Sequence, residues 1–370
     1  MVMRVCIVVG TRPEIVKMAS VIKQLEADGS DFTIIHSGQH YDQNMSEVFF
    51  KELDLPVPDT NLEIGSSSPL RQMARALTGL DKAFRRVDPD TVLVEGDTNT
   101  VLAAALASTK LGIDTGHVEA GLRSYDLRMP EEHNRRLTDH LSHHLFAPTG
   151  KAASILRMEH CWGRIYVTGN TVIDACLLYG SKAEKARISS MVEPGLFALA
   201  TAHRAENVDD PRILREIFKI LVGCPLPVVF PIHPRTRSRF RSAGLLRKLE
   251  SSENIILLPP VGYIDFLWLM IHCQFIITDS GGIQEEATAP NIMKKVFVVR
   301  ESTERPEAVE AGYAEVVGIK AAAVLRRIRV HQEQKWSPRA KCPYGNGTAG
   351  QQIVRRILRT KEISRTSLVS

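Results

Sequence analysis

Apolar runs separated by amphipathic stretches predict alternating strands and helices along the first half of the chain. Val5–Val9 is an unbroken apolar run, which is typical of a buried strand. A helix should follow, because Thr11 and Glu14 have capping-box spacing and Pro13 suits a first helical turn. Further strands are predicted at 32–36, 91–95, around 118, 145–148 and 164–168. Strands separated by helices of this length indicate right-handed βαβ units and a parallel sheet.

The same pattern begins again after about residue 172. Strand-like runs recur at 199–202, 228–232, 254–258, 275–278 and 296–299, with helical segments between them. A chain of 370 residues is too long for one hydrophobic core, so we expect two domains. The sequence therefore predicts an α/β protein with two doubly wound Rossmann-like domains facing a cleft, at residues 1–172 and 173–352.

Composition places the chain among ordinary globular proteins, with 44% hydrophobic and 24% charged residues. The run Val5–Val9 is too short for a signal peptide or a membrane span, and no later run approaches twenty apolar residues. We therefore expect a cytoplasmic protein without a membrane partner. The six cysteines are far apart and form no CxxC pair, which favours buried thiols over disulfides or a zinc site.

The net charge of +5 comes from the last part of the chain. From Lys320 onward there are 12 of the 47 Lys and Arg residues but 2 of the 42 acidic ones, which leaves 35 and 40 before it. Such a tail could contact nucleic acid, but no aromatic or Gly-rich nucleic-acid motif accompanies it. We favour a helix with one solvated face and expect no nucleic-acid partner. Its apolar stripe would comprise Ile353, Val354, Ile357 and Leu358, with Arg355, Arg356 and Arg359 off the stripe.

Acidic residues follow successive strand or turn positions between Val94 and Arg136. They are Asp97, Glu119 and the pair Glu131/Glu132. In an open α/β sheet, strand ends direct side chains into a ligand-binding crevice. We therefore expect these carboxylates to share a chemical site.

The segment Thr278–Glu286 combines a strand end, glycines and a helix start. Backbone N–H groups of Ser280, Gly281 and Gly282 could bind a phosphate there, and Glu285 or Glu286 could reach ribose hydroxyls. The alternative is an ordinary helix start stabilised by acidic residues. The segment is not a GxGxxG fingerprint, so we predict no nicotinamide cofactor.

Basic residues and histidines stand at other loop–helix junctions. Arg12, Lys17 and Arg305 suit a diphosphate, although such a residue taken alone is more often a surface ion-pair partner. His203 and His233 follow strands, where they could titrate in a cleft or act only as structural hydrogen-bonding groups. A metal site would draw on His133, His140, His143 and His144, because 140 and 144 are one helical turn apart. No HExxH motif is present, and we predict no metal.

Eight motifs taken together carry a resemblance to a known family. They are Gly10–Glu14 with Lys17-Met18, Gly96–Thr98, His117–Arg123, Pro130–Glu132 with Asn134-Arg135, Gly169–Thr171, His203-Arg204 with Glu206-Asn207, Ser280–Glu286 and Thr303–Glu307. In this order the chain resembles the non-hydrolysing UDP-N-acetylglucosamine 2-epimerases, from Val5 to the segment Pro343–Gly347.

The resemblance implies a glycosyltransferase-B-like fold whose last helix, about 353–370, packs back on the N-terminal domain. It implies interconversion of UDP-GlcNAc and UDP-ManNAc without metal or nicotinamide. A base removes the C2 proton while UDP leaves C1, and the 2-acetamidoglucal is reprotonated on its other face before UDP returns. Family precedent also suggests a homodimer and a role in polysaccharide biosynthesis.

Site residues follow from matching positions and from the needs of the reaction. Inversion at C2 requires proton-transfer groups on two faces of the sugar, and the departing diphosphate requires positive charge. The expected catalytic residues are Asp97, Glu119, Glu131, His203, Arg135 and Lys17. The expected substrate-binding residues are Arg12, His233, Phe266, Ser280, Gly281, Gly282, Glu286 and Arg305.

The chain departs from the family pattern in three places. Segment 288–295 is about two residues longer, 320–341 is unusually basic, and Gln39–Gln43 matches only partly the loop that binds an activating second UDP-GlcNAc in bacterial members. Alternative functions are a 2-epimerase of a modified sugar, such as a 2,3-diacetamido uronic acid nucleotide, and a hydrolysing variant. A retaining glycosyltransferase and a nucleic-acid-binding protein with a degenerate site are further alternatives.

Overall fold

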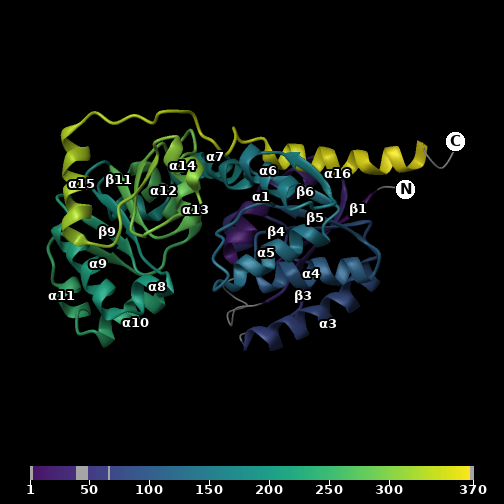
Figure 1. The fold of residues 1–370 in the computed structure, drawn as a ribbon, viewed down its shortest axis with the longest axis horizontal. Helices are drawn as coiled ribbons and strands as arrows, with labels where there is room; N and C mark the ends of the chain where they lie inside the picture. The colour runs from purple at the N-terminus through teal and green to yellow at the C-terminus, as the bar shows by residue number, and fades with distance from the viewer. Residues whose placement is uncertain (1–2, 39–48, 66, 367–370) are drawn as a thin grey trace. The chain divides into compact units, whose positions relative to one another are not determined.

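The computed structural model describes residues 3–38, 49–65 and 67–366, and the chain divides into two compact units. Unit 1 comprises Met1–Ala175 together with Tyr344–Ser370, and unit 2 comprises Cys176–Pro343. Each unit has one parallel sheet with helices packed around it (Figure 1). This confirms the predicted α/β class with two doubly wound parts. The predicted loop Gln39–Gln43 lies outside the described residues.

The sheet of unit 1 has seven strands in the order β3-β2-β1-β4-β5-β6-β7. The chain winds outward from β1 in both directions, so its topological switch point lies between β1 and β4. Ligands of such sheets bind at the carboxyl ends of the strands beside this point. The strands are β1 (Arg4–Val9), β2 (Asp31–His36), β3 (Thr60–Asn61), β4 (Thr91–Glu95), β5 (Asp114–Val118), β6 (His144–Ala147) and β7 (Arg164–Val167).

Helices of unit 1 bury the apolar side chains of this sheet. Leu80 and Phe84 of α3 and Ala104 of α4 pack with Cys6 and Val92 of the strands in one hydrophobic cluster. The helices are α1 (Arg12–Ala27), α3 (Pro69–Val87), α4 (Asn99–Lys110), α5 (Pro130–Leu141), α6 (Gly150–Met158), the start of α7 (Thr171–Ala183) and α16 (Ala349–Thr366).

The last helix, α16, belongs to unit 1 although unit 2 separates it from the rest in sequence (Figure 1). It packs against α1. The close approach requires Gly350, because a side chain there would lie 2.8 Å from the backbone of Ser20. Asp174 accepts hydrogen bonds from the N–H groups of Ala349 and Gly350, at 3.1 and 2.7 Å. Of the predicted apolar stripe, Ile353, Val354 and Ile357 are buried and Leu358 is half-buried.

Unit 2 has a six-stranded sheet in the order β10-β9-β8-β11-β12-β13. Its switch point lies between β8 and β11, and their carboxyl ends carry the segments after Thr201 and Thr278. The strands are β8 (Ala198–Thr201), β9 (Val228–Pro231), β10 (Ile255–Leu258), β11 (Phe275–Thr278), β12 (Lys295–Val298) and β13 (Ala314–Val316). The helices are the end of α7, η1 (Arg187–Ser190), α8 (Ala205–Val208), α9 (Pro211–Gly223), α10 (Pro234–Ser242), α11 (Leu246–Glu250), α12 (Tyr263–His272), α13 (Gly281–Glu286), α14 (Pro306–Glu310) and α15 (Ala321–Glu333).

Some local predictions need correction. The strands β3 and β13 were not predicted, because two and three residues leave almost no alternating pattern. His140 lies near the end of α5 whereas His144 begins β6, so they are not one turn apart on a helix. The six cysteines are free thiols, five of them buried, as predicted. Within the described residues no helix is both long and apolar enough to cross a membrane.

The capping box of α1 forms only in part. Glu14 accepts hydrogen bonds from the Gly10 N–H at 2.6 Å and from the Thr11 hydroxyl at 3.0 Å. The Thr11 side chain does not accept the hydrogen bond from a backbone N–H of the first helical turn that would complete the capping box. The carboxylate of Glu14 is thereby held inside the protein at the end of β1.

Candidate active site

A buried cluster of carboxylates stands at the strand ends beside the switch point of unit 1. Glu95 is the last residue of β4, Glu119 directly follows β5, and Lys17 comes from α1. The Lys17 Nζ lies 3.0 Å from Glu95 Oε1 and also contacts Glu119 Oε2. Asn170 donates a hydrogen bond to Glu119 at 3.3 Å. Lys17 and Glu119, both predicted site residues, are therefore in direct contact.

Two carboxyl groups in this cluster hold protons far more tightly than ordinary glutamates. Burial raises the pKa of Glu95 well above its usual value, and the nearby charges of Glu119 and Glu14 act in the same direction, whereas Lys17 opposes the shift. Burial also raises the pKa of Glu14 to about 7, against the hydrogen bonds from Gly10, Thr98 and Thr11. Groups that titrate near neutrality can accept and return protons during a reaction.

Asp97 is held by a second ion-pair system. Arg135 on α5 contacts Asp97, and its other terminal nitrogen lies 2.9 Å from Glu132. About one third of the Asp97 side chain is exposed, so its carboxylate remains accessible. Glu132 is fully buried. Burial alone would raise the pKa of Glu132, but hydrogen bonds from Ser124 and the charge of Arg135 lower it, so Glu132 stays negative and orients Arg135.

Glu131 differs from its neighbour. It is exposed in the first turn of α5, and among the described residues no hydrogen bond or ion pair joins it to Asp97 or Glu119. Successive positions on a helix point in different directions, which explains why Glu132 turns inward and Glu131 outward. The expected catalytic role of Glu131 stays a prediction.

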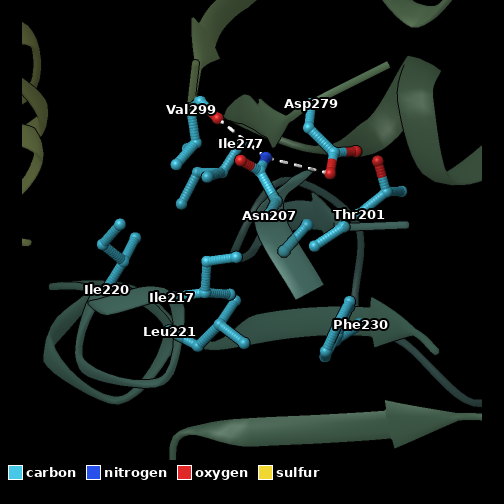
Figure 2. Close-up of a pocket in the computed structure, with 11 residues that line it drawn as sticks. Thr201, Asn207, Ile217, Ile220, Leu221, Phe230, Ile277, Asp279 and Val299 are labelled. Atoms are coloured by element: carbon cyan, nitrogen blue, oxygen red, sulfur yellow. Dashed lines mark hydrogen bonds between the residues drawn. The ribbon is translucent and has the colours of Figure 1, made fainter. Parts of the chain in front are cut away.

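At the switch point of unit 2, Asp279 organises the residues around it. Its carboxylate accepts hydrogen bonds from the backbone N–H groups of His203 and Arg204, both at 3.0 Å, and lies 3.2 Å from His203 Nδ1. Figure 2 shows Asn207 donating to Asp279 at 3.1 Å and to the Val299 carbonyl at 3.0 Å. The small cavity drawn there is otherwise lined mainly by core side chains, so we do not regard it as a substrate site.

This arrangement fixes the chemistry of His203. Burial would raise the pKa of Asp279, but the hydrogen bonds and charge of His203 keep it below its usual value. Asp279 is therefore negative and holds the Nδ1 side of the ring. Since 44% of the His203 side chain is exposed, Nε2 is left to face a ligand.

His233 lies close to His203, with 6.1 Å between ring centroids. Its Nδ1 accepts the N–H of Arg235 at 3.2 Å, so in the neutral ring the proton is on Nε2. Partial burial and the charge of His203 lower the pKa of His233. The exposed ring can therefore donate a hydrogen bond from Nε2 while it remains neutral.

The Gly-rich segment and Arg305 belong to one tightly packed corner of unit 2. A side chain at Gly281 would lie 2.8 Å from Glu304 Oε1, so the Glu304 carboxylate would have to move. Arg305 is buried, with its Nε 2.6 Å from Glu285 Oε1. Glu285 is fully buried, so of the two residues expected to reach a ribose only the half-buried Glu286 qualifies. Ser280 and Gly282 are half-buried at the start of α13, which has only six residues.

Glu304 links this corner to two further arginines. It contacts Arg204 and lies 2.5 Å from Arg300 Nη1. Burial favours a higher pKa, but the charges of Arg305, Arg204 and Arg300 lower the pKa of Glu304 to about 2. This carboxylate carries a permanent charge.

Two predicted ligand-binding residues lie at the edges of these clusters. Arg12 begins α1 in unit 1, and its guanidinium stands 4.6 Å from the ring centroid of Phe49. Phe266 is half-buried on α12 in unit 2. No contact in the structure tests their expected roles.

One group of side chains offers metal-ligand atoms within 4.8 Å of one another: His140, Glu159 and Cys161. Glu159 is already paired with Arg123 at 2.7 Å. A metal ion there would have to displace this guanidinium, so the donor set does not favour one.

Sequence analysis missed Glu95, which ends a strand that is otherwise largely apolar. A carboxylate inside the run Thr91–Glu95 is itself a signal, because burying such a group is costly unless it has a partner. Asp279 and Glu304 were also not predicted as organisers, because His203 and Arg204, which contact them, lie far away in the sequence.

Two doubly wound parallel units, each with charged groups at its central strand ends, define a two-domain α/β protein of the glycosyltransferase-B-like class. A sequence model of the UDP-N-acetylglucosamine 2-epimerase family matches residues 23–358. The chain belongs to this family, as its motifs predicted.

Relatives and solved structures agree with this assignment. The UDP-N-acetylglucosamine 2-epimerase of Methanocaldococcus jannaschii is 44% identical over 95% of this chain and 98% of its own. A Pseudomonas aeruginosa UDP-2,3-diacetamido-2,3-dideoxy-D-glucuronate 2-epimerase is 37% identical, with the same coverage. The crystal structure of the M. jannaschii UDP-GlcNAc 2-epimerase in complex with UDP-GlcNAc and UDP is similar, with a TM-score of 0.88, 43% identity and coverage of 96% and 99%. The crystal structure of the Neisseria meningitidis UDP-GlcNAc 2-epimerase bound to UDP-GlcNAc is also similar. Its TM-score is 0.87 and its identity 34%, with 96% of this chain and 100% of that chain covered.

Proposed function

We propose that this protein is an isomerase that interconverts UDP-GlcNAc and UDP-ManNAc without hydrolysing them. The observation that carries the proposal is the buried cluster of Lys17, Glu95 and Glu119 in unit 1. This cluster combines the carboxyl group of Glu95, whose pKa is raised, with the Glu119 carboxylate and an ammonium group at the strand ends. Its occurrence in a chain 44% identical to a UDP-N-acetylglucosamine 2-epimerase supports proton transfer at a sugar carbon.

The proposed reaction is an elimination followed by a re-addition. A carboxylate removes the C2 proton, the C–H electron pair forms a C1–C2 double bond, and UDP leaves C1 with the electrons of the broken C–O bond. The resulting 2-acetamidoglucal takes a proton on the opposite face of C2, and UDP adds again at C1. Asp97, Glu119 and Glu131 are the candidates for the proton transfers, with Lys17 and Arg135 orienting two of them.

Unit 2 is proposed to hold the UDP portion. His203 and the neutral His233 can donate hydrogen bonds to the diphosphate, and the backbone N–H groups of Ser280, Gly281 and Gly282 are further donors. Asp279 supports the role of His203 because it fixes Nδ1 and leaves Nε2 for the ligand. Phe266, Glu286 and Arg305 are expected to hold the nucleoside side, Arg305 from within its buried pair with Glu285.

A second candidate substrate is a modified nucleotide sugar. The Pseudomonas relative named for a diacetamido glucuronate is nearly as long and 37% identical. The same proton-transfer groups would serve that sugar, because its chemistry at C2 is the same.

We further infer that the protein acts in the cytoplasm as a homodimer and serves polysaccharide biosynthesis. These inferences rest on family precedent. Sedimentation of the purified protein at several concentrations would test the dimer, and a single monomeric species would contradict it.

The decisive experiment is proton NMR of the purified protein with UDP-GlcNAc in D2O. Deuterium should appear at C2 together with UDP-ManNAc, because each elimination loses the C2 proton to the protein and solvent. Free UDP accumulating instead would identify a hydrolysing variant. Absence of exchange with UDP-GlcNAc, but exchange with the diacetamido uronate nucleotide, would favour the second candidate. Exchange with neither would contradict the proposed function.

A further inference from the structure

A buried histidine in β5 lies between two hydrogen-bond acceptors. His117 Nδ1 is 2.7 Å from Asp139 Oδ1, and Nε2 is 2.8 Å from the carbonyl oxygen of Gly96. A carbonyl only accepts hydrogen bonds, so Nε2 must carry a hydrogen. A second proton must then lie between Nδ1 and the carboxylate, because two lone pairs would otherwise face each other. His117 and Asp139 therefore form a pair that shares a proton.

The same carboxylate reaches a neighbouring turn. Asp139 Oδ2 accepts a hydrogen bond from the N–H of Gly121 at 3.2 Å and lies 2.8 Å from Arg123 Nη2. Arg123 in turn pairs with Glu159. The side chains of Asp139 and Arg123 are completely buried and that of His117 is 1% exposed. With the shared proton, two positive groups balance two carboxylates, so the network can remain in the interior.

The two backbone groups that this pair holds belong to the turns that present the proposed catalytic carboxylates. Gly96 precedes Asp97 and has a φ of +86°, while Glu119 itself has a φ of +70°, which is unusual outside glycine. The Gly96 N–H also donates to the Val118 carbonyl at 3.2 Å, which joins the two turns. His117 thus fixes the turn before Asp97, and Asp139 fixes the turn after Glu119.

We propose that His117 and Asp139 are positioning residues for the proton-transfer step, which hold the turns of Asp97 and Glu119 in a fixed relation. This inference rests on the proposed function, because it assigns these two carboxylates to the reaction. Neither His117 nor Asp139 contacts the substrate in this scheme. Their contribution is the orientation of the groups that do.

Two substitutions of His117 separate its two hydrogen bonds. In His117→Gln the amide nitrogen replaces Nε2 and keeps the bond to Gly96. In His117→Asn the amide nitrogen replaces Nδ1. This variant keeps the hydrogen bond to Asp139 but loses the one to the Gly96 carbonyl. Deuterium exchange at C2 should fall about 100-fold in His117→Asn, because small misplacements of reacting groups cost that much, and less than about 10-fold in His117→Gln. UDP binding, measured by calorimetry, should be unchanged in both.

His144 provides the matched control. It is a buried histidine on the neighbouring strand β6, and its Nδ1 has no hydrogen-bond partner among the described residues. His144→Asn and His144→Gln should differ little from each other in C2 exchange. If His117 had only a structural role, the C2 exchange rates of all four variants would follow their free energies of unfolding in urea. That outcome would overturn the proposal. Near-normal exchange in His117→Asn would overturn it as well.

A backbone measurement separates this inference from the proposed function. If the wild-type protein exchanges the C2 proton of neither nucleotide sugar, the proposed function is contradicted. The backbone amide resonances then test the positioning role of His117 by themselves. His117→Asn should then shift the amides of Asp97 and Thr98 while His117→Gln leaves them in place. Equal shifts in both variants would overturn the positioning role.

Discussion

The strand ends of unit 1 and unit 2 both bury carboxylates, but with different partners. Glu14 and Glu95 in unit 1 meet neutral donors and the single ammonium of Lys17, and their pKa values rise. Asp279 and Glu304 in unit 2 meet a histidine and several guanidinium groups, and their pKa values fall. The same burial therefore gives carboxyl groups with raised pKa values in one unit and a set of fixed negative charges in the other. The difference matches the proposed chemistry, in which a sugar carbon exchanges protons while a diphosphate stays ionised.

The largest expected effect concerns the proton-transfer groups of unit 1. Asp97→Asn and Glu119→Gln should each reduce C2 exchange by about 100-fold or more, because each removes a base. UDP affinity should be retained, because the nucleotide is assigned to unit 2. Exchange rates by NMR and UDP binding by calorimetry would test this. Near-normal exchange in either variant would remove that residue from the catalytic set.

A matched pair of Glu→Gln changes tests the comparison directly. Glu304→Gln should lower the free energy of unfolding by about 3–5 kcal/mol, because Arg204 and Arg300 lose their buried carboxylate. Glu95→Gln should change it by less than about 1 kcal/mol, because burial raises the pKa of Glu95 and so favours the neutral carboxyl group, which glutamine resembles in shape. Urea unfolding at pH 7 would measure both. Equal losses would show that the two units do not differ as proposed.

A smaller effect should appear in the pH dependence of stability. Folding raises the pKa of Glu14 from 4.5 to about 7, so between these values the native state binds more protons than the unfolded state. The stability of the wild type relative to Glu14→Gln should therefore fall as the pH rises from about 4.5 to 7, by at most about 3 kcal/mol. Urea unfolding of both proteins across this pH range gives the difference between their free energies of unfolding. A difference that does not change with pH would contradict the raised pKa of Glu14.

The sequence predicted eleven of the strands, most of them from short runs rich in apolar residues that lie between turn signals. Two shorter strands, β3 and β13, gave no such signal. The motifs also identified the family, and they placed Lys17 and Glu119 in one set. Two of the pairs now seen, Lys17–Glu119 and Asp97–Arg135, join residues far apart in the chain.

Burial was harder to predict than position. Glu131 and Glu132 are adjacent and both acidic, and only the rotation of α5 against unit 1 decides that Glu132 is buried. Likewise, Glu285 was a candidate ribose ligand until its ion pair with Arg305 appeared. Such choices depend on tertiary packing, which no local spacing records.

The return of α16 to unit 1 has a consequence for how the protein is made. Unit 2 is continuous in sequence, whereas unit 1 begins first and is completed last. During synthesis from the N-terminus, the surface of α1 against which α16 packs stays uncovered until the chain beyond Tyr344 has left the ribosome. The helix α1 also carries Glu14 and Lys17, so the element that supplies two groups of the carboxylate cluster gains its last packing partner only when the final helix docks. Translation stopped before Ala349 would therefore leave unit 1 without the helix that covers α1.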